Sequence, residues 1–158
     1  MDDDSRFQGE PIADSTMETL LREQGFGVLS LAREGMAYGI PISAGYDDGR
    51  LYFVFFGFGA ASSRKLEMVQ HTETGSFLVH EITSPDDWWS VIAQGAIRLV
   101  DSRKEWERLE AAMRDNAWRP NILDDAAKSN GVEGYVLEVA DVRGWRGPDA
   151  EFEALDEA

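Results

Sequence analysis

Six stretches of the chain are rich in β-branched and aromatic residues, either alternating with polar residues or in short apolar runs. They cover residues 25–31, 36–46, 51–56, 74–82, 91–100 and 132–142. This pattern is typical of β-strands. Arg33-Glu34-Gly35 and Asp47-Asp48-Gly49 separate the first three stretches and predict tight hairpin turns. The sequence therefore predicts a mainly β, α+β fold: six antiparallel strands that form a barrel with flanking helices.

Three segments have helical spacing instead. Ser15-Thr16-Met17-Glu18 is a capping-box pattern, and it predicts a helix that runs to Gln24 and stops at Gly25. A second helix is expected from about residue 63 to 70. Ser102-Arg103-Lys104-Glu105 is another capping box, followed by an apolar stripe that ends near Asn116. We expect this stripe to pack on the core, as most amphipathic helices do.

Two residues predict irregularities in the strands. Pro41 has no N–H to donate, so the strand over 36–46 lies at a sheet edge, or its N–H side faces a ligand or a bulge at that point. Gly95 lies in the middle of the strand over 91–100, where it indicates a β-bulge.

Length and composition favour one domain without disulfides. The chain has 158 residues, enough for a single core. It contains no cysteine, which excludes disulfides and Cys-ligated metals, and His71 and His80 are too few for a histidine-rich metal site. No apolar run reaches membrane-spanning length, and the N-terminus is acidic where a signal peptide would be basic. We expect a cytoplasmic protein.

The net charge of the chain indicates which macromolecules it is not expected to bind. Fifteen basic against thirty acidic residues give a net charge of −15, and only Lys65, Lys104 and Lys128 are lysines. Such a surface repels nucleic acid and anionic membrane, so neither is an expected partner. A high-salt cytoplasm favours this composition because screening removes the self-repulsion. The alternative is an ordinary acidic protein whose charged termini raise the count.

The segment 50–66 carries the candidate chemistry. An apolar strand is followed by a Gly- and Ala-rich loop and then by Ser62-Ser63-Arg64-Lys65 at the start of a helical pattern. A helix start offers unpaired N–H groups and a positive dipole end, and Ser, Arg and Lys side chains add donors for an anion. The residues alone fit a phosphate site and an ordinary Ser-capped helix equally well.

The chain has no recognisable catalytic motif of its own. A nucleophile elbow, a zinc-protease helix and a P-loop are all absent from the sequence. His71 precedes a turn, where we expect it to cap the preceding helix, and His80 alternates along a strand. Catalysis would then depend on a cofactor. A phosphate site beside aromatic residues and a barrel edge is consistent with flavin mononucleotide (FMN).

Several short motifs resemble the pyridoxamine 5′-phosphate oxidase-like, FMN-binding split barrels. They are Gly27-Val28-Leu29-Ser30, Gly39-Ile40-Pro41-Ile42-Ser43, Leu51-Tyr52-Phe53, Ser63-Arg64-Lys65 and Trp89-Ser90-Val91 ahead of Gly95. Trp106 with Asn116-Ala117-Trp118 is similar to a branch of this family that is common in haloarchaea. The resemblance covers residues 14–147 and leaves 1–13 as a flexible arm and 148–158 as an acidic tail.

The resemblance implies a cofactor site and a homodimer with two flavin sites at its interface. Arg64 and Lys65 would hold the FMN phosphate, with Ser63 beside them. The isoalloxazine ring would lie along Tyr38, Gly39, Ile40, Pro41 and Ile42. Val54 and Phe55 would follow the ribityl chain, Ser90 would face the flavin, and Trp145 would close over it. Trp88, Trp89 and Trp145 are candidates for the interface, with core packing as the alternative.

The implied function is that of an FMN-dependent oxidoreductase acting on a small molecule that the sequence does not identify. The alternative is a protein that binds or stores flavin, deazaflavin F420 or haem without turnover. True pyridoxamine phosphate oxidases carry a C-terminal Arg-Leu-His type segment for the substrate phosphate. Residues 148–158 contain neither Arg nor His, so we do not expect that substrate. The connection between Phe56 and Ser62 is longer and richer in glycine than is usual in the family.

Overall fold

The computed structural model describes residues 9–56, 64–119 and 131–152. Within them the strands are β1 (Glu10–Pro11), β2 (Phe26–Arg33), β3 (Met36–Ser43), β4 (Gly45–Asp47), β5 (Arg50–Phe56), β6 (Thr74–Ile82), β7 (Trp88–Leu99) and β8 (Val132–Arg146). The helices are α2 (Asp14–Gln24), α3 (Arg64–His71) and α4 (Arg103–Met113). The strands form one sheet in the order β3-β2-β6-β7-β8-β5-β4, and β1 pairs with β8.

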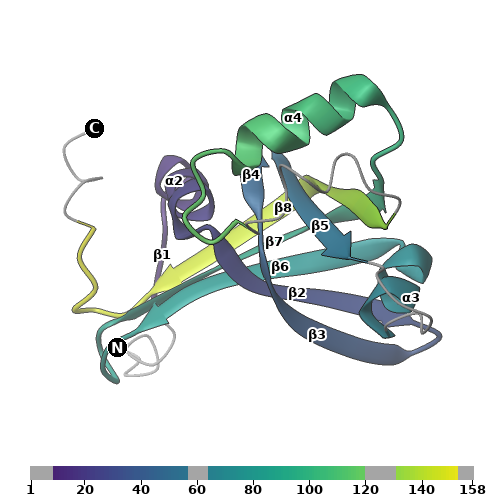
Figure 1. The fold of residues 1–158 in the computed structure, drawn as a ribbon. Coiled ribbons are helices and arrows are strands. Elements are labelled where there is room, and N and C mark those ends of the chain that lie inside the picture. The colour runs from purple at the N-terminus through teal and green to yellow at the C-terminus, as the bar shows by residue number, and fades with distance from the viewer. Residues whose placement is uncertain (1–8, 57–63, 120–130, 153–158) are drawn as a thin grey trace.

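All strand pairings in the described residues are antiparallel. The sheet curls until β3 and β5 come into contact, but no ladder joins these two strands in the part that the structure describes. Figure 1 shows α4 lying over β4, β5 and β8, with α3 beside the β2–β3 turn and the end of β5. The architecture is an open split barrel, which confirms the predicted fold class.

The six predicted strands are the six long strands of the sheet. Two short strands are added. Ala44 separates β3 from β4, and its N–H donates to the carbonyl of Gly25 at 3.0 Å. β3 lies at one end of the strand order, so the edge position expected from Pro41 is confirmed.

The inward face of the curled sheet forms the main core. Leu29, Phe53, Phe77 and Leu137 are buried, and the rings of Phe53 and Phe77 meet edge to face at 5.3 Å. Burial alternates along β7 from Trp88 to Arg98, as expected for a strand with one face to the core and one to the outside. Trp89 belongs to this core, which agrees with core packing, the alternative to its interface role.

The two capping-box predictions have different outcomes. The N–H of Glu105 donates to the Ser102 hydroxyl at 3.1 Å, and this confirms the cap of α4. α2 begins two residues earlier than the capping box predicts, at Asp14 instead of Thr16, and its N-cap is Ala13 without a side-chain hydrogen bond. Ser15 is therefore inside the helix, because the extended backbone of Ala13 already accepts the first intrahelical hydrogen bond from Met17.

The predicted turns and bulge are present. Asp48 and Gly49 have φ angles of 45° and 76°, which is typical of a type I′ hairpin turn. The β7–β8 register shifts between Gln94 and Gly95, where a β-bulge occurs. A Cβ atom at Gly95 would lie 1.7 Å from the carbonyl oxygen of Glu138, so this close strand approach requires glycine.

Residues on both sides of 14–147 also pack against the sheet. The end of the expected arm forms β1, and Ile12 is buried with its N–H bonded to Gly144. In the expected acidic tail, Ala150 and Phe152 are buried, and the Phe152 ring packs against Trp89. An apolar residue in a charged segment gains burial by folding back onto the sheet. None of the described helices is long and apolar enough to cross a membrane.

Candidate cofactor site

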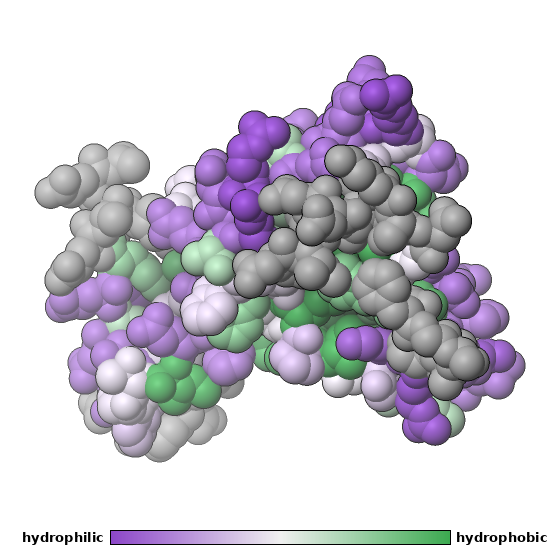
Figure 2. Space-filling model, viewed as in Figure 1, coloured by the Kyte–Doolittle hydropathy of each residue, from purple (hydrophilic) through white to green (hydrophobic). Residues whose placement is uncertain are grey.

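A cavity of about 520 Å³ lies in the split between β3 and β5, next to the start of α3. We call it the β3–β5 cavity. Its lining residues are Tyr38, Ile40, Pro41, Ile42, Ser43, Val54, Phe55, Phe56, Arg64 and Lys65. In the space-filling view, hydrophobic residues gather over β3 and β5 beside α3 (Figure 2). The cavity therefore has apolar walls and one cationic end.

The strand register explains the apolar walls. Tyr38, Ile40 and Ile42 alternate along β3, and Ile40 is buried with only 7% of its surface exposed. On the opposite wall, Val54 and Phe55 are buried near the end of β5. Because β3 and β5 form no ladder with each other in the described residues, the gap between them is open to a flat ligand.

The cationic end consists of the first two residues of α3. Arg64 and Lys65 are exposed, and neither forms an ion pair with any residue that the structure describes. No carboxylate is among the residues found to line the cavity. The N-terminal end of a helix also carries a partial positive charge. Together these features favour an anion, and phosphate is the group that helix starts commonly bind.

The structure brings together most of the predicted site residues, but not all. Gly39 is exposed on the other side of β3, and Ser63 lies outside the described residues. Ser90 and Trp145 face each other as register partners on β7 and β8, on the outer face of the sheet and away from the lining of the cavity. Trp89 and Val91, on either side of Ser90 in β7, take the inward positions.

The sequence prediction missed two lining residues. Ser43 follows Ile42 directly at the end of β3, and Phe56 is the last residue of β5. Both lie within predicted strands, but each is one residue beyond the site residues predicted on its strand, 38–42 and 54–55. The continuous apolar run to Phe56 was a usable signal for the second of them.

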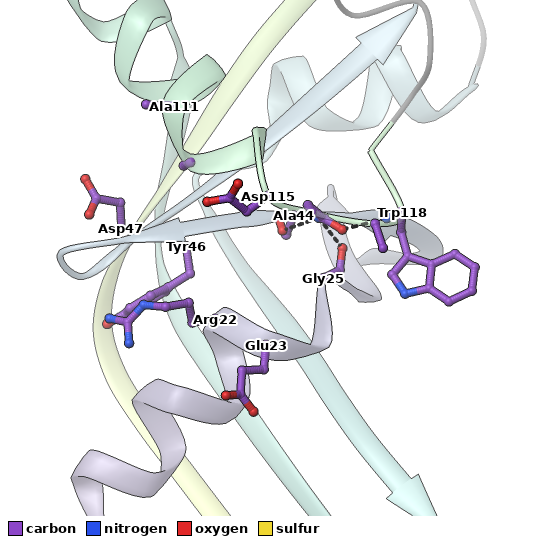
Figure 3. Close-up of a pocket in the computed structure, with 12 residues that line it drawn as sticks. Arg22, Glu23, Gly25, Ala44, Tyr46, Asp47, Ala111, Asp115 and Trp118 are labelled. Atoms are coloured by element: carbon purple, nitrogen blue, oxygen red, sulfur yellow. Dashed lines mark hydrogen bonds between the residues drawn. The ribbon is translucent and has the colours of Figure 1, made fainter. Parts of the chain in front are cut away.

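A larger cavity of about 590 Å³, the α2–α4 cavity, lies between α2, β4 and the end of α4 (Figure 3). The Asn116 side chain forms its base, donating to the carbonyls of Gly25 and Ala44 at 2.7 and 2.9 Å. Its charged lining residues are Arg22, Glu23, Asp47 and Asp115. The one cation in that set, Arg22, already contacts Glu18 and the Tyr46 ring.

The two cavities therefore differ in the charge of their lining residues. The acidic lining of the α2–α4 cavity repels a phosphate, whereas the β3–β5 cavity presents two cations without a carboxylate among its lining residues. Burial and the nearby Glu18 carboxylate raise the pKa of Tyr46 in the α2–α4 cavity, so its hydroxyl stays protonated at neutral pH. The smaller cavity is the better anion site.

The sequence profile of the family described as pyridoxamine 5′-phosphate oxidase matches residues 13–146. The chain belongs to the pyridoxamine 5′-phosphate oxidase-like family. No curated protein matches the sequence.

Several solved structures are similar in fold to this chain. An FAD-binding protein from Mesorhizobium loti is 18% identical, with a TM-score of 0.64 over 85% of this chain and 95% of the other. An FAD-binding protein from Mycobacterium smegmatis is 13% identical, with a TM-score of 0.67 over 87% and 98%. A heme-binding protein from Mycobacterium smegmatis is 16% identical, with a TM-score of 0.68 over 89% and 56%.

The histidines of this family member are outside the β3–β5 cavity. Nδ1 of His71 lies 2.8 Å from the carbonyl oxygen of Glu67 in the last turn of α3, which confirms the predicted helix-capping role. His80 is exposed on β6. In residues 9–56, 64–119 and 131–152, no group of three His, Cys, Asp or Glu side chains is placed to hold a metal ion.

Proposed function

We propose that the chain is an FMN-binding flavoprotein that exchanges hydride or electrons with a small molecule. The observation that carries this proposal is the β3–β5 cavity, where apolar walls meet two cations without ion pairs in the described residues. The apolar walls suit a flat aromatic ring system, and the cationic end suits a phosphate. The residues present therefore fit FMN.

Each part of the cavity has a role in this proposal. Arg64 and Lys65 bind the phosphate, and the start of α3 adds N–H donors. The ring system lies along Tyr38, Ile40 and Ile42, while Val54 and Phe55 exclude water beside the ribityl chain. Bound flavin supplies the redox chemistry, and the chain supplies binding, orientation and a dry environment.

We also propose a homodimer that places Ser90 and Trp145 of the partner subunit near this site. Val28, Leu78 and Ile92 are register neighbours on the outer face of β2, β6 and β7. Ile92 is 41% exposed, and Trp145 on the same face is 43% exposed. An apolar face of this kind on a chain with a charge of −15 supports a two-fold contact between copies.

The visible spectrum of the purified protein tests the proposed cofactor. Flavin, deazaflavin and haem absorb differently, so the spectrum separates FMN from its alternatives. Haem is the second candidate because a protein of similar fold is a heme-binding protein. Bleaching of the bound flavin by NAD(P)H supports an oxidoreductase. A colourless protein that takes up none of the three cofactors contradicts the proposal.

Sedimentation in high salt tests the dimer. We expect Ile92→Glu to give a monomer with weakened FMN binding, because a charge at the centre of the contact is costly to bury. Leu99→Glu is the matched control, since Leu99 is 46% exposed on the same strand but lies outside the Val28–Leu78–Ile92 row. A monomeric wild type that binds FMN tightly contradicts the dimer.

The proposed setting is a high-salt cytoplasm, as for a haloarchaeal-type member. The charge of −15 and the three lysines support it. The substrate is open. We do not propose pyridoxamine phosphate, because the last eleven residues lack the Arg and His that would hold its phosphate.

A further inference from the structure

Arg64 borders two cavities. Besides the β3–β5 cavity, it lines a smaller one of about 280 Å³ together with Arg33 and Glu67. The guanidinium proposed to bind phosphate is therefore close to a carboxylate that belongs to its own helix.

Glu67 could compete with the phosphate for the guanidinium of Arg64. The two residues are three positions apart on α3, and side chains with this spacing are neighbours on a helix surface. An Arg64–Glu67 pair would occupy the cation and bring negative charge toward the phosphate site. The structure instead shows Nη1 of Arg33 at 2.6 Å from Oε1 of Glu67. Arg64 has no ion pair within the described residues.

The position of Arg33 relative to α3 is fixed by the fold. Thr72 follows the last residue of α3 and is only 5% exposed. Its hydroxyl accepts from the N–H of Ala32 at 3.2 Å and donates to the carbonyl of Met68 at 2.7 Å. These hydrogen bonds join α3 to the end of β2, next to Arg33. The Arg33–Glu67 pair is therefore built on two elements that are tied together.

We infer that Arg33 is a positioning residue for the phosphate site: by pairing with Glu67, it keeps Arg64 available to the cofactor. The inference rests on the proposed function. If Arg33 is removed, Glu67 turns to Arg64, and the phosphate both loses a partner and meets a carboxylate. A purely structural role for Arg33 would affect all ligands of the cavity equally, whereas this role affects only phosphate-bearing ones.

The test is a set of fluorescence titrations with FMN and with riboflavin, which lacks the phosphate. Arg33→Ala should weaken FMN binding about fivefold, the upper range for an exposed ion pair, and leave riboflavin binding unchanged. Adding Glu67→Gln to Arg33→Ala should restore FMN affinity. Adding Glu107→Gln on α4 instead restores the same net charge away from both cavities that Arg64 lines, and it should not rescue binding. Arg22→Ala breaks the exposed Arg22–Glu18 pair and should have no effect.

The outcomes separate this inference from the proposed function. FMN binding that is unchanged in Arg33→Ala overturns the inference alone. So does a loss that persists with Glu67→Gln, which would mean direct contact between Arg33 and the phosphate, or an equal loss for riboflavin, which would mean a structural role. A wild type that binds no FMN overturns the proposed function, and the inference with it.

Discussion

The charged residues at two helix starts in this molecule have different partners. At α4, the guanidinium of Arg98 lies 2.6 and 2.9 Å from the two carboxylate oxygens of Glu105 and 3.0 Å from Glu138. At α3, Arg64 and Lys65 have no such partner in the described part of the chain, and Glu67 is held by Arg33. The first set of charges joins a helix to the sheet, and the second remains available for a ligand.

The pKa values at the α4 junction follow this pattern. Hydrogen bonds from Arg98 lower the pKa of Glu105, and hydrogen bonds to Glu105 and Glu138 raise the pKa of Arg98. Both groups therefore stay charged and paired at neutral pH. In an acidic chain, a cation without a carboxylate partner is the less expected arrangement. We propose that the charges at the α3 start serve a ligand instead of the fold, because Arg64 and Lys65 also line the β3–β5 cavity.

The largest expected effect is at α3. Replacing both Arg64 and Lys65 with alanine should weaken FMN binding by about 1–3 kcal/mol per residue, because each substitution removes a charge-assisted hydrogen bond to phosphate. Thermal stability should not change, since both side chains are exposed. FMN titration combined with a melting curve measures both quantities. Unchanged FMN affinity would make this segment an ordinary helix start.

The α4 junction should respond in the opposite way. Glu105→Gln is expected to lower the free energy of unfolding by about 1 kcal/mol, the upper range for a partly exposed ion pair, without any effect on FMN binding. Glu107→Gln is the matched control, because its pair with Arg103 is much more exposed. Urea unfolding measures the difference. Equal effects of the two substitutions would contradict the role of the Arg98–Glu105 pair.

The contribution of Glu105 should also depend on pH. Its pKa is lowered in the folded chain, so its stabilisation is fully present above the unfolded value of about 4.3 and is lost as pH falls through the folded value. The gap in stability between wild type and Glu105→Gln should therefore close in acid. Urea unfolding at neutral pH and near pH 3 measures this gap. A gap that stays constant between these conditions is the contrary result.

Added salt should have the smallest effect on stability per charge. Its direction tests whether the local ion pairs or the repulsion from the net charge matter more for the melting temperature. Screening weakens the α4 ion pairs but also removes the repulsion of a chain with a charge of −15. We expect repulsion to dominate, so that the melting temperature rises by at least ~2 °C, or about 0.5–1 kcal/mol, from low to molar KCl. A flat or falling melting temperature would assign the acidic surface to ordinary composition.

Local signals predicted much of this fold. The Asp48-Gly49 turn, the Ser102 cap and the Gly95 bulge each depend on neighbouring residues, and each is present. The position of Arg64 and Lys65 beside β3 was also predictable. The pattern of residues 50–66 indicated the basic helix start, and the family resemblance placed residues 38–42 next to it.

The features that the sequence did not predict depend on contacts between segments that are distant in the chain. Asn116 bonds to Gly25 across 91 positions and to Ala44 across 72, and no local pattern indicates either bond. Phe152 folds back onto Trp89, although its segment is acidic and has the composition of a tail. The placement of Ser90 and Trp145 on the outer face depends on strand register, and a sequence gives register only approximately.

The central proposal is that Arg64 and Lys65, which form no ion pair within residues 9–56, 64–119 and 131–152, hold a phosphate. It is tested most directly by titrating the wild-type protein with FMN and riboflavin under the same conditions. Two charge-assisted contacts predict that FMN binds at least ~100-fold more tightly than riboflavin. Equal affinities for the two flavins would show that the phosphate contributes nothing and would contradict the account.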